Sequence, residues 1–227
     1  MNMTPAHLWI SMGIPAKAVA ILMILMLFAC VYVAIERVLL FMKTRGQSRA
    51  IAAAISKPLA AGNLEGAVKI AKDPAFSAAY LGAILRAGLV EFEARPDHHG
   101  VEALKRAVDR VTQQEQGALR KGMNILATTG STTPFVGLVG TIFGIINAFS
   151  MMSAVGGGDL TAISGGIAEA LVSTAVGIGV AIVAIWFYNY FNAVLDDIGK
   201  DMTIASQELI DWAEKESLRR SELQAAK

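Results

Sequence analysis

The sequence predicts an all-α membrane protein with three transmembrane helices, a helical cytoplasmic domain, and long helices that extend from spans two and three into the cytoplasm. The 227 residues are 54% hydrophobic and only 17% charged, and the mean hydropathy is +0.50, which is more apolar than an ordinary soluble domain. Three long segments carry almost no charge. The polar segments between them show helical spacing of apolar residues and no strand-like alternation.

The charge balance and the motif content argue against several functional classes. The formal net charge is +1, with 20 Lys and Arg residues against 19 Asp and Glu residues, so no basic excess favours nucleic-acid binding. There is no phosphate-binding Gly-x-x-x-x-Gly-Lys sequence, and the single cysteine, Cys30, cannot form an intrachain disulfide. His7, His98 and His99 lie in a terminus and a polar loop, where they suit neither a metal site nor a catalytic triad. We therefore expect no enzymatic activity, no cofactor, no metal and no nucleic-acid partner.

The first span is predicted over residues 18–35, which are all apolar. As a helix this segment would be about 27 Å long, against about 30 Å for the hydrocarbon core of a bilayer. Residues 1–17 precede it, with a possible amphipathic segment around His7–Met12 at the membrane surface. Glu36 and Arg37 follow the span in place of a small-residue cleavage site, so we expect an uncleaved anchor.

Residues 36–126 are expected to form a helical cytoplasmic domain. Alanine-rich, helix-favouring runs cover Ala50–Ile55, Leu64–Ala71 and Ala75–Phe92. The breaks that divide the domain are expected at Gly46, Lys57-Pro58, Gly62-Asn63, Asp73-Pro74 and Arg95–Gly100. From Val101 the apolar residues follow a heptad spacing that continues toward Leu126, so one helix is expected to run from this domain into the second span.

The second span, predicted over residues 127–152, is rich in small residues. Gly140 and Gly144 form a small-x-x-x-small pair, a pattern that lets helix backbones approach closely in lipid. Steps of three and four place one hydroxyl and several small residues in a single stripe, formed by Gly130, Pro134, Gly137, Thr141, Gly144 and Ala148. A short outer loop is expected at residues 153–163.

The third span is predicted over residues 164–191, followed by a C-terminal helix over residues 192–227. The span ends in an interfacial aromatic group formed by Trp186, Tyr188 and Tyr190. Nine Lys and Arg residues flank the two ends of the 36–126 region, whereas the short outer loop has none. The positive-inside rule therefore places that region and the C-terminus in the cytoplasm, and the N-terminus and the short loop in the periplasm.

Glu169 is the only charged residue of the third span. An ionised side chain at the centre of a membrane helix costs about 2.5–3.5 kcal/mol on insertion scales, so it is retained where it has a partner, a cavity or a task. On a helical wheel Ser173, Val176 and Val180 share the face of Glu169. A second stripe, about 95° away, contains Gly166, Ala170, Thr174, Gly177, Ala181 and Ala184. We expect this stripe to pack against another helix and the Glu169 face to present its carboxylate away from that contact.

Two stretches carry a family resemblance. Leu126–Phe149 has the sequence LATTGSTTPFVGLVGTIFGIINAF, and Gly166–Gly177 has the sequence GIAEALVSTAVG, followed by Tyr188-Asn-Tyr. Both stretches resemble the MotA/TolQ/ExbB proton-channel family, and the three-span ExbB/TolQ branch in particular. The span layout and the long inner loop extend the resemblance over the whole chain.

The chain departs from the usual family pattern at three positions in the third span. Gly165 stands where a proline commonly precedes Gly-Ile-Ala-Glu, Ser173 replaces an alanine, and Val183 replaces a proline. The loss of two prolines predicts a straighter third helix.

The resemblance implies a multi-pass protein of the bacterial inner membrane that forms a homo-oligomer, a pentameric ring around a dimer of a single-span ExbD/TolR-like subunit. It implies that proton flow is coupled to movement of the ring, that the partner supplies an essential membrane aspartate, and that a TonB/TolA-like energy transducer is a further partner. By motif position, Glu169, Thr141 and Thr174 match the polar residues that line the proton path. The residues expected to pack the helices are Gly137, Gly140, Gly144, Gly166, Ala170 and Gly177.

Several alternatives remain open from the sequence. The powered process is outer-membrane transport, TolQ-like envelope integrity or gliding motility, and the ion is a proton or sodium. From another class, the chain is a non-conducting membrane scaffold in which Glu169 only caps its helix or reaches the interface. A stand-alone ion channel is disfavoured because the second and third spans contain no second acidic residue.

Overall fold

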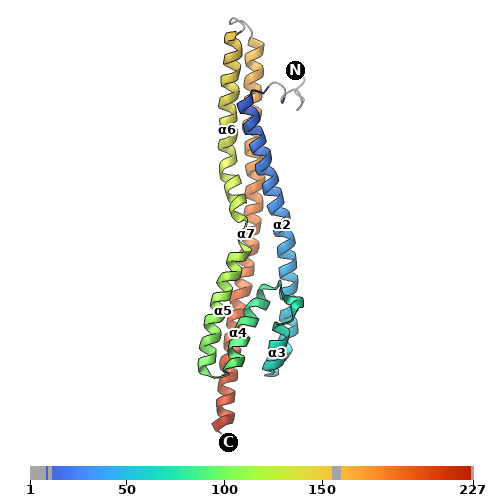
Figure 1. The fold of residues 1–227 in the computed structure, drawn as a ribbon, viewed down its shortest axis with the longest axis vertical. Coiled ribbons are helices and arrows are strands. Elements are labelled where there is room, and N and C mark those ends of the chain that lie inside the picture. Colours follow the sequence, from blue (N-terminus) through green and yellow to red (C-terminus); the bar gives the residue numbers. More distant parts are fainter. Residues whose placement is uncertain (1–8, 10–11, 155–159, 226–227) are drawn as a thin grey trace. The chain divides into compact units, whose positions relative to one another are not determined.

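The computed structural model describes residue 9, residues 12–154 and residues 160–225, without the side chains of residues 154, 160–163, 169 and 224–225. The helices are α2 (Ile14–Ala60), α3 (Leu64–Ala71), α4 (Tyr80–Ala94), α5 (His98–Leu119), α6 (Met123–Ala154) and α7 (Leu160–Ala225), with a short 3-10 helix, η1 (Pro74–Phe76) (Figure 1). The described part of the chain contains no strand, which confirms the all-α class. Most of the segment expected around His7–Met12 lies outside the described residues.

Three helices are long and apolar enough to cross a membrane. They include the segments Ile14–Ala60, Met123–Ser153 and Ser164–Leu223. The chain divides into two compact units. The membrane unit contains residues 1–35 and 122–191, and the polar unit contains residues 36–121 and 192–227.

The expected break at Gly46 is wrong, because α2 continues without interruption to Ala60. A glycine inside a helix costs only about 1 kcal/mol relative to alanine, and helix-favouring residues follow on the C-terminal side. The break at Gly62-Asn63 is confirmed. Gly62 has φ of +65°, a conformation that glycine adopts readily, and the Asn63 side chain caps α3 by accepting a hydrogen bond from the Gly66 amide at 2.9 Å.

The expected single helix from Val101 into the second span is interrupted. Helix α5 ends at Leu119 and α6 begins at Met123. Between them Gly122 has φ of +80°, which the helical pattern of apolar residues could not indicate. The continuation of the third span into a long polar helix is confirmed, since α7 runs unbroken to Ala225.

Helices α6 and α7 include some of the residues predicted to form the loop at 153–163. Helix α6 reaches Ala154, and α7 begins at Leu160. The intervening residues 155–159 lie outside the described part of the chain.

The polar unit is held by an aromatic and apolar interior. Phe92 of α4 and Trp212 of α7 pack edge to face with ring centroids 5.8 Å apart, and both Phe92 and Leu209 are buried. The indole nitrogen of Trp212 also donates to the Leu59 carbonyl at 2.8 Å, which in addition accepts from the Gly62 amide at 3.1 Å, so α7 is hydrogen-bonded to the last turn of α2.

Candidate functional site: the α6–α7 contact in the membrane unit

Helices α6 and α7 approach each other in backbone contact. A Cβ atom on Gly177 would lie 2.8 Å from the Thr133 carbonyl oxygen and 3.0 Å from the Gly137 Cα. A Cβ atom on Gly144 would lie 2.8 Å from the Cβ of Ala170. The small residues therefore create a contact that larger side chains would prevent.

The same contact continues toward the C-terminal end of α6 and the N-terminal end of α7. Here a Cβ on Gly166 would lie 3.2 Å from the Cα of Ala148. Ala148 and Ala170 are both buried at 2% exposure. The stripe proposed from residue spacing on each helix therefore lies at this helix contact.

Thr141 of α6 and Thr174 of α7 bring two hydroxyl groups together at the edge of this contact. Their Oγ1 atoms are hydrogen-bonded to each other. The Thr141 hydroxyl also lies 3.2 Å from the carbonyl oxygens of Gly137 and Ala170, and the Thr174 hydroxyl lies 3.3 Å from the Gly137 carbonyl oxygen. Each hydroxyl can therefore donate either to the oxygen of the other hydroxyl or to a carbonyl oxygen. The carbonyl acceptors are those of Gly137 and Ala170 for Thr141, and that of Gly137 for Thr174.

A hydroxyl group both donates and accepts, so this pair can reorient its hydrogen bonds and hand a proton on. The partners that the structure describes for these hydroxyls are uncharged, and both side chains are only partly buried. The pair therefore provides two polar groups at the helix contact, neither of which carries a fixed charge.

Glu169 lies within α7, but its side chain is outside the part of the chain that the structure describes. Its place along the helix is defined by its neighbours. Ala170, the next residue, is buried against Gly144, and Thr174 lies five residues after Glu169, about 7.5 Å along the helix axis. The described residues therefore bring Thr141 and Thr174 together, whereas the carboxylate of Glu169 is placed only by helical register.

The α7 face shared by Glu169 and Ser173 is divided between buried and exposed residues. Ser173 and Val180 are 3% and 6% exposed, whereas Val176 is 46% exposed. The expectation that this face presents the Glu169 carboxylate away from the helix contact stays a prediction, because that side chain lies outside the described part of the chain. On the Ser173 side, an added Cβ on Gly140 of α6 would meet both the Ser173 Oγ and, at 3.0 Å, the Cγ1 of Val19 on α2.

Outside this contact, the membrane unit exposes large apolar side chains of the kind that suit lipid or another membrane helix. On α6 and α7 they include Phe135, Leu138, Ile142, Ile146, Leu171, Ile178 and Trp186.

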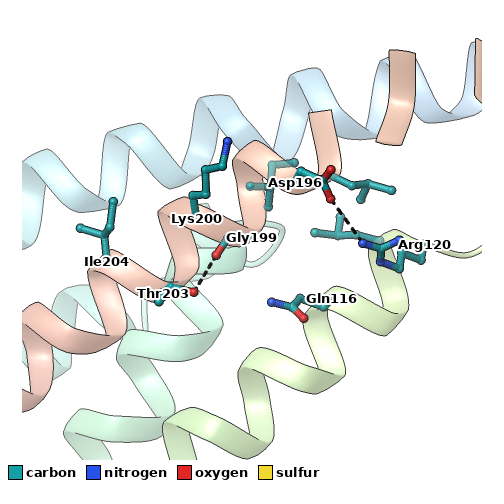
Figure 2. A pocket seen from close by; sticks show the side chains of 10 residues that line it. Gln116, Arg120, Asp196, Gly199, Lys200, Thr203 and Ile204 are labelled. Carbon is teal, nitrogen blue, oxygen red and sulfur yellow. Dashed lines mark hydrogen bonds and ion pairs between the residues drawn. The ribbon is translucent and has the colours of Figure 1, made fainter. Parts of the chain in front are cut away.

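The polar unit has a groove of about 510 Å³ between α5 and α7 (Figure 2). Leu119, Leu195 and Ile198 form its apolar floor and are buried. Arg120 and Asp196 form an ion pair at 3.6 Å on its rim. With exposed charges and an apolar floor, the groove has no convergent acid, base or nucleophile.

Among the described residues, no cluster of three or more His, Cys, Asp or Glu side chains could hold a metal ion.

The fold and this contact define a class: a helical membrane protein in which two spans meet through small residues and enclose paired hydroxyls. A family model described as the MotA/TolQ/ExbB proton channel family matches residues 77–204, which is more than half of the chain. The chain belongs to the MotA/TolQ/ExbB proton channel family.

Named relatives are similar over part of their length. The biopolymer transport protein ExbB of Xanthomonas campestris pv. campestris is 37% identical over 111 residues, or 49% of this chain and 44% of that protein. The Tol-Pal system protein TolQ of Pseudomonas aeruginosa is 39% identical over 131 residues, or 55% of this chain and 57% of that protein. The ExbB protein of Neisseria gonorrhoeae is 40% identical over 88 residues, or 39% of this chain and 40% of that protein. The chain thus spans about half the length of the curated relatives it matches.

Proposed function

We propose that this chain is the proton-channel subunit of a motor driven by the proton-motive force in the bacterial inner membrane. It forms a homo-oligomeric ring, a pentamer, around a single-span ExbD/TolR-like partner that carries a membrane aspartate. Proton flow moves the ring relative to its partner and so powers an envelope process such as outer-membrane transport, through a TonB/TolA-like energy transducer. The N-terminus faces the periplasm and the C-terminus the cytoplasm.

The observation that carries this proposal is the hydrogen-bonded pair of Thr141 and Thr174 beside the glycine contact of α6 and α7. A threonine in a membrane helix ordinarily bonds a carbonyl of its own helix. Here Thr141 also reaches the Ala170 carbonyl of the neighbouring helix, and Thr174 reaches the Gly137 carbonyl. Hydroxyls directed across a helix contact suit a path for a proton better than they suit simple anchoring.

Glu169 is assigned the outer end of this path. In the proposed topology it lies closer to the periplasmic end of α7 than Thr174 does, so it can attract or relay protons before they reach the hydroxyl pair and the partner's aspartate. Moving one charge through 100 mV releases about 2.3 kcal/mol, which is enough to bias a rotation between nearly equivalent packings. The small residues of the contact favour such motion because their short side chains do not interlock with those of the neighbouring helix.

Energy transduction in cells tests the role of Glu169. Replacing Glu169 by Ala is expected to abolish the partner-dependent process while the protein still accumulates in the membrane. Full retention of the process in this variant would show that Glu169 has no central role.

The second candidate is a TolQ-like envelope-integrity or gliding-motility subunit, supported by the similarity to TolQ of Pseudomonas aeruginosa. The site chemistry is the same in both cases, so deletion phenotypes distinguish them: loss of nutrient uptake supports the transport process, and leakage of periplasmic proteins supports the envelope process. A non-conducting scaffold, by contrast, predicts no proton flux into vesicles that contain the chain and its partner.

A further inference from the structure

Helix α2 has an inverted polarity in the turns that follow the predicted first span. Its buried side chains there include Arg37 and Ser48, which are 5% and 0% exposed. Its exposed side chains include Val38, Leu39 and Met42, which are 39%, 63% and 69% exposed. A helix at the surface of a soluble domain instead buries its apolar side chains and exposes its polar ones. The arrangement in this part of α2 therefore suits apolar surroundings.

The exposed apolar side chains continue the outer face of the first span. They follow Phe28, Tyr32 and Ile35, which are 68%, 71% and 58% exposed. Steps of three and four residues keep Leu39 and Met42 on the same side of the helix as Ile35, and α2 is unbroken through this segment (Figure 1). A contiguous exposed apolar face marks a surface that contacts a membrane or another protein.

The apolar face ends in a basic border. After Met42 the exposed residues include Lys43, Gly46 and Arg49. As a helix, residues 18–42 would be about 37 Å long, which fits within the about 40–45 Å of a bilayer with its interfacial regions. A lysine can lay its stem along apolar surface and place its ammonium group among anionic headgroups. The order of apolar and basic side chains thus matches the order of acyl chains and phosphate groups in one lipid leaflet.

Arg37 lies within this stretch, but its charge is held inside the protein. Its Nη1 donates to the Leu119 carbonyl at 3.2 Å, and its Nη2 donates to Oε1 of the half-exposed Glu36 at 2.5 Å. Charged side chains at membrane depth characteristically pair with one another or with backbone carbonyls. In the sequence Arg37 resembles the edge of a span, whereas its burial removes it from the face that lipid would meet.

We propose that lipid covers α2 as far as Met42, about two helical turns beyond the predicted end of the first span at residue 35. Val38, Leu39 and Met42 contact the acyl chains and the glycerol region of the leaflet at this end of the span, and Lys43 reaches its phosphate groups. The inference requires a bilayer but not proton conduction, so it goes beyond the proposed function without depending on it.

Fluorescence quenching in vesicles of phosphatidylethanolamine and phosphatidylglycerol tests this lipid contact. Cys30, which is 0% exposed, is replaced by alanine in the full chain, and a bimane probe is attached to Ile35→Cys, Leu39→Cys or Met42→Cys. Nitroxide-labelled lipid is expected to quench the probes at residues 39 and 42 to the same extent as the probe at residue 35. Iodide in the water is expected to leave all three probes bright.

Gly46→Cys is the matched control on the same face of α2. Gly46 is exposed, lies one turn beyond Met42, and has no atom within 4 Å of an added Cβ. A probe there lies past the basic border that begins at Lys43. We therefore expect iodide to quench it and nitroxide-labelled lipid to have little effect.

Leu39→Glu and Val90→Glu test the same surface without a probe. Both place a carboxylate at an exposed apolar position of the polar unit, 63% exposed for Leu39 and 37% exposed for Val90 of α4. A carboxylate against lipid is costly, whereas a substitution on a surface in water has little effect. Leu39→Glu is expected to lower the melting temperature in lipid nanodiscs, and Val90→Glu is expected to leave it unchanged. Equal melting temperatures would contradict the lipid contact.

The other possible coverings of this face give different results. If iodide quenches the probes at residues 39 and 42 as strongly as the probe at residue 46, water covers the face and the inference is wrong. If neither quencher reaches them, another protein surface, such as a second copy of this chain, covers the face and the inference is again wrong. Neither result bears on proton flux, which tests the proposed function separately.

Discussion

At the scale of single residues, glycine determines how closely α6 and α7 approach. Gly177 and Gly137 meet backbone to backbone: an added Cβ on Gly177 collides with the Thr133 carbonyl oxygen at 2.8 Å, and one on Gly137 lies tightly against the Ser173 carbonyl oxygen at 3.0 Å. Gly179, two residues further along α7, has no atom within 4 Å of its added Cβ. The two positions on one helix therefore form a matched pair for substitution.

Gly177→Ala is expected to destabilise the membrane unit and to reduce proton flux, because overpacking of a close contact costs about 1–3 kcal/mol. Gly179→Ala gains the same helix propensity without the collision, so its stability should equal or slightly exceed that of the wild type. Thermal unfolding in detergent compares the two variants. Equal melting temperatures would contradict the close contact at Gly177.

The spacing of small residues predicts that one face of each helix packs closely against another helix, and the structure places Gly137 and Gly144 of α6 beside Gly177 and Ala170 of α7. The pairing of Thr141 with Thr174 could not be predicted from residue spacing alone, since spacing on one helix gives no register against its neighbour. The burial of Ser173 could not be predicted either, because residue spacing on one helix does not give the positions of the neighbouring helices.

At the scale of helices, the backbone conformation of three glycines decides where helices end. Gly46 lies inside α2 and is exposed, with no atom within 4 Å of an added Cβ. Gly62 and Gly122 have positive φ angles and lie at helix ends. From the sequence, breaks are expected at Gly46 and Gly62 and a continuous helix through Gly122, since a pattern of residue types carries no φ angle.

Gly46→Ala is expected to raise the free energy of unfolding by about 1 kcal/mol, the difference in helix propensity between glycine and alanine. Gly62→Ala is expected to lower it, since alanine at positive φ costs about 1–2 kcal/mol and its Cβ would lie 2.8 Å from the Arg219 Nη2. Denaturant unfolding of the purified protein measures both changes. A stabilising Gly62→Ala would mean that α2 does not end in this turn.

In the C-terminal part of α7, Glu216 forms ion pairs whose contribution to stability depends on pH. Glu216 is 5% exposed and binds Arg219, with Nε to Oε2 at 2.9 Å, and Arg220, with Nε to Oε1 at 2.7 Å. Hydrogen bonding from Arg219, assisted by Arg220, lowers the pKa of Glu216 despite its burial. A lowered pKa in the folded state gives stability that is present above the unfolded value, about 4.3, and is lost as the pH falls through the folded value.

Glu216→Gln is therefore expected to increase amide hydrogen exchange near Trp212 and Leu59 at pH 7. The difference from the wild type should shrink as the pH is lowered below about 4. Hydrogen exchange followed by mass spectrometry, corrected for the intrinsic pH dependence of exchange, measures this. A difference in exchange that stays constant with pH would show that this protection does not depend on the charge of Glu216.

At the scale of the whole molecule, composition and segment length were enough to predict the all-α membrane class and the three apolar helices. They sufficed because the cost of exposing polar backbone groups to lipid leaves few alternatives. The proposed ring and its proposed partner are not encoded in any local pattern of one chain, since they depend on surfaces that a second polypeptide would complete. The exposed apolar faces of α6 and α7 are where such contacts are expected.

The central claim is that the Thr141–Thr174 pair lies on the proton path. Proton uptake by vesicles that contain the chain and its single-span partner tests this claim for the wild type, Thr174→Ser and Thr174→Val. Serine keeps the hydroxyl and should conduct at close to the wild-type rate, whereas valine keeps the shape without the hydroxyl and should reduce flux about tenfold or more, since each group that carries a proton contributes at least that much. Wild-type flux in Thr174→Val, with the assembly intact, would contradict the account.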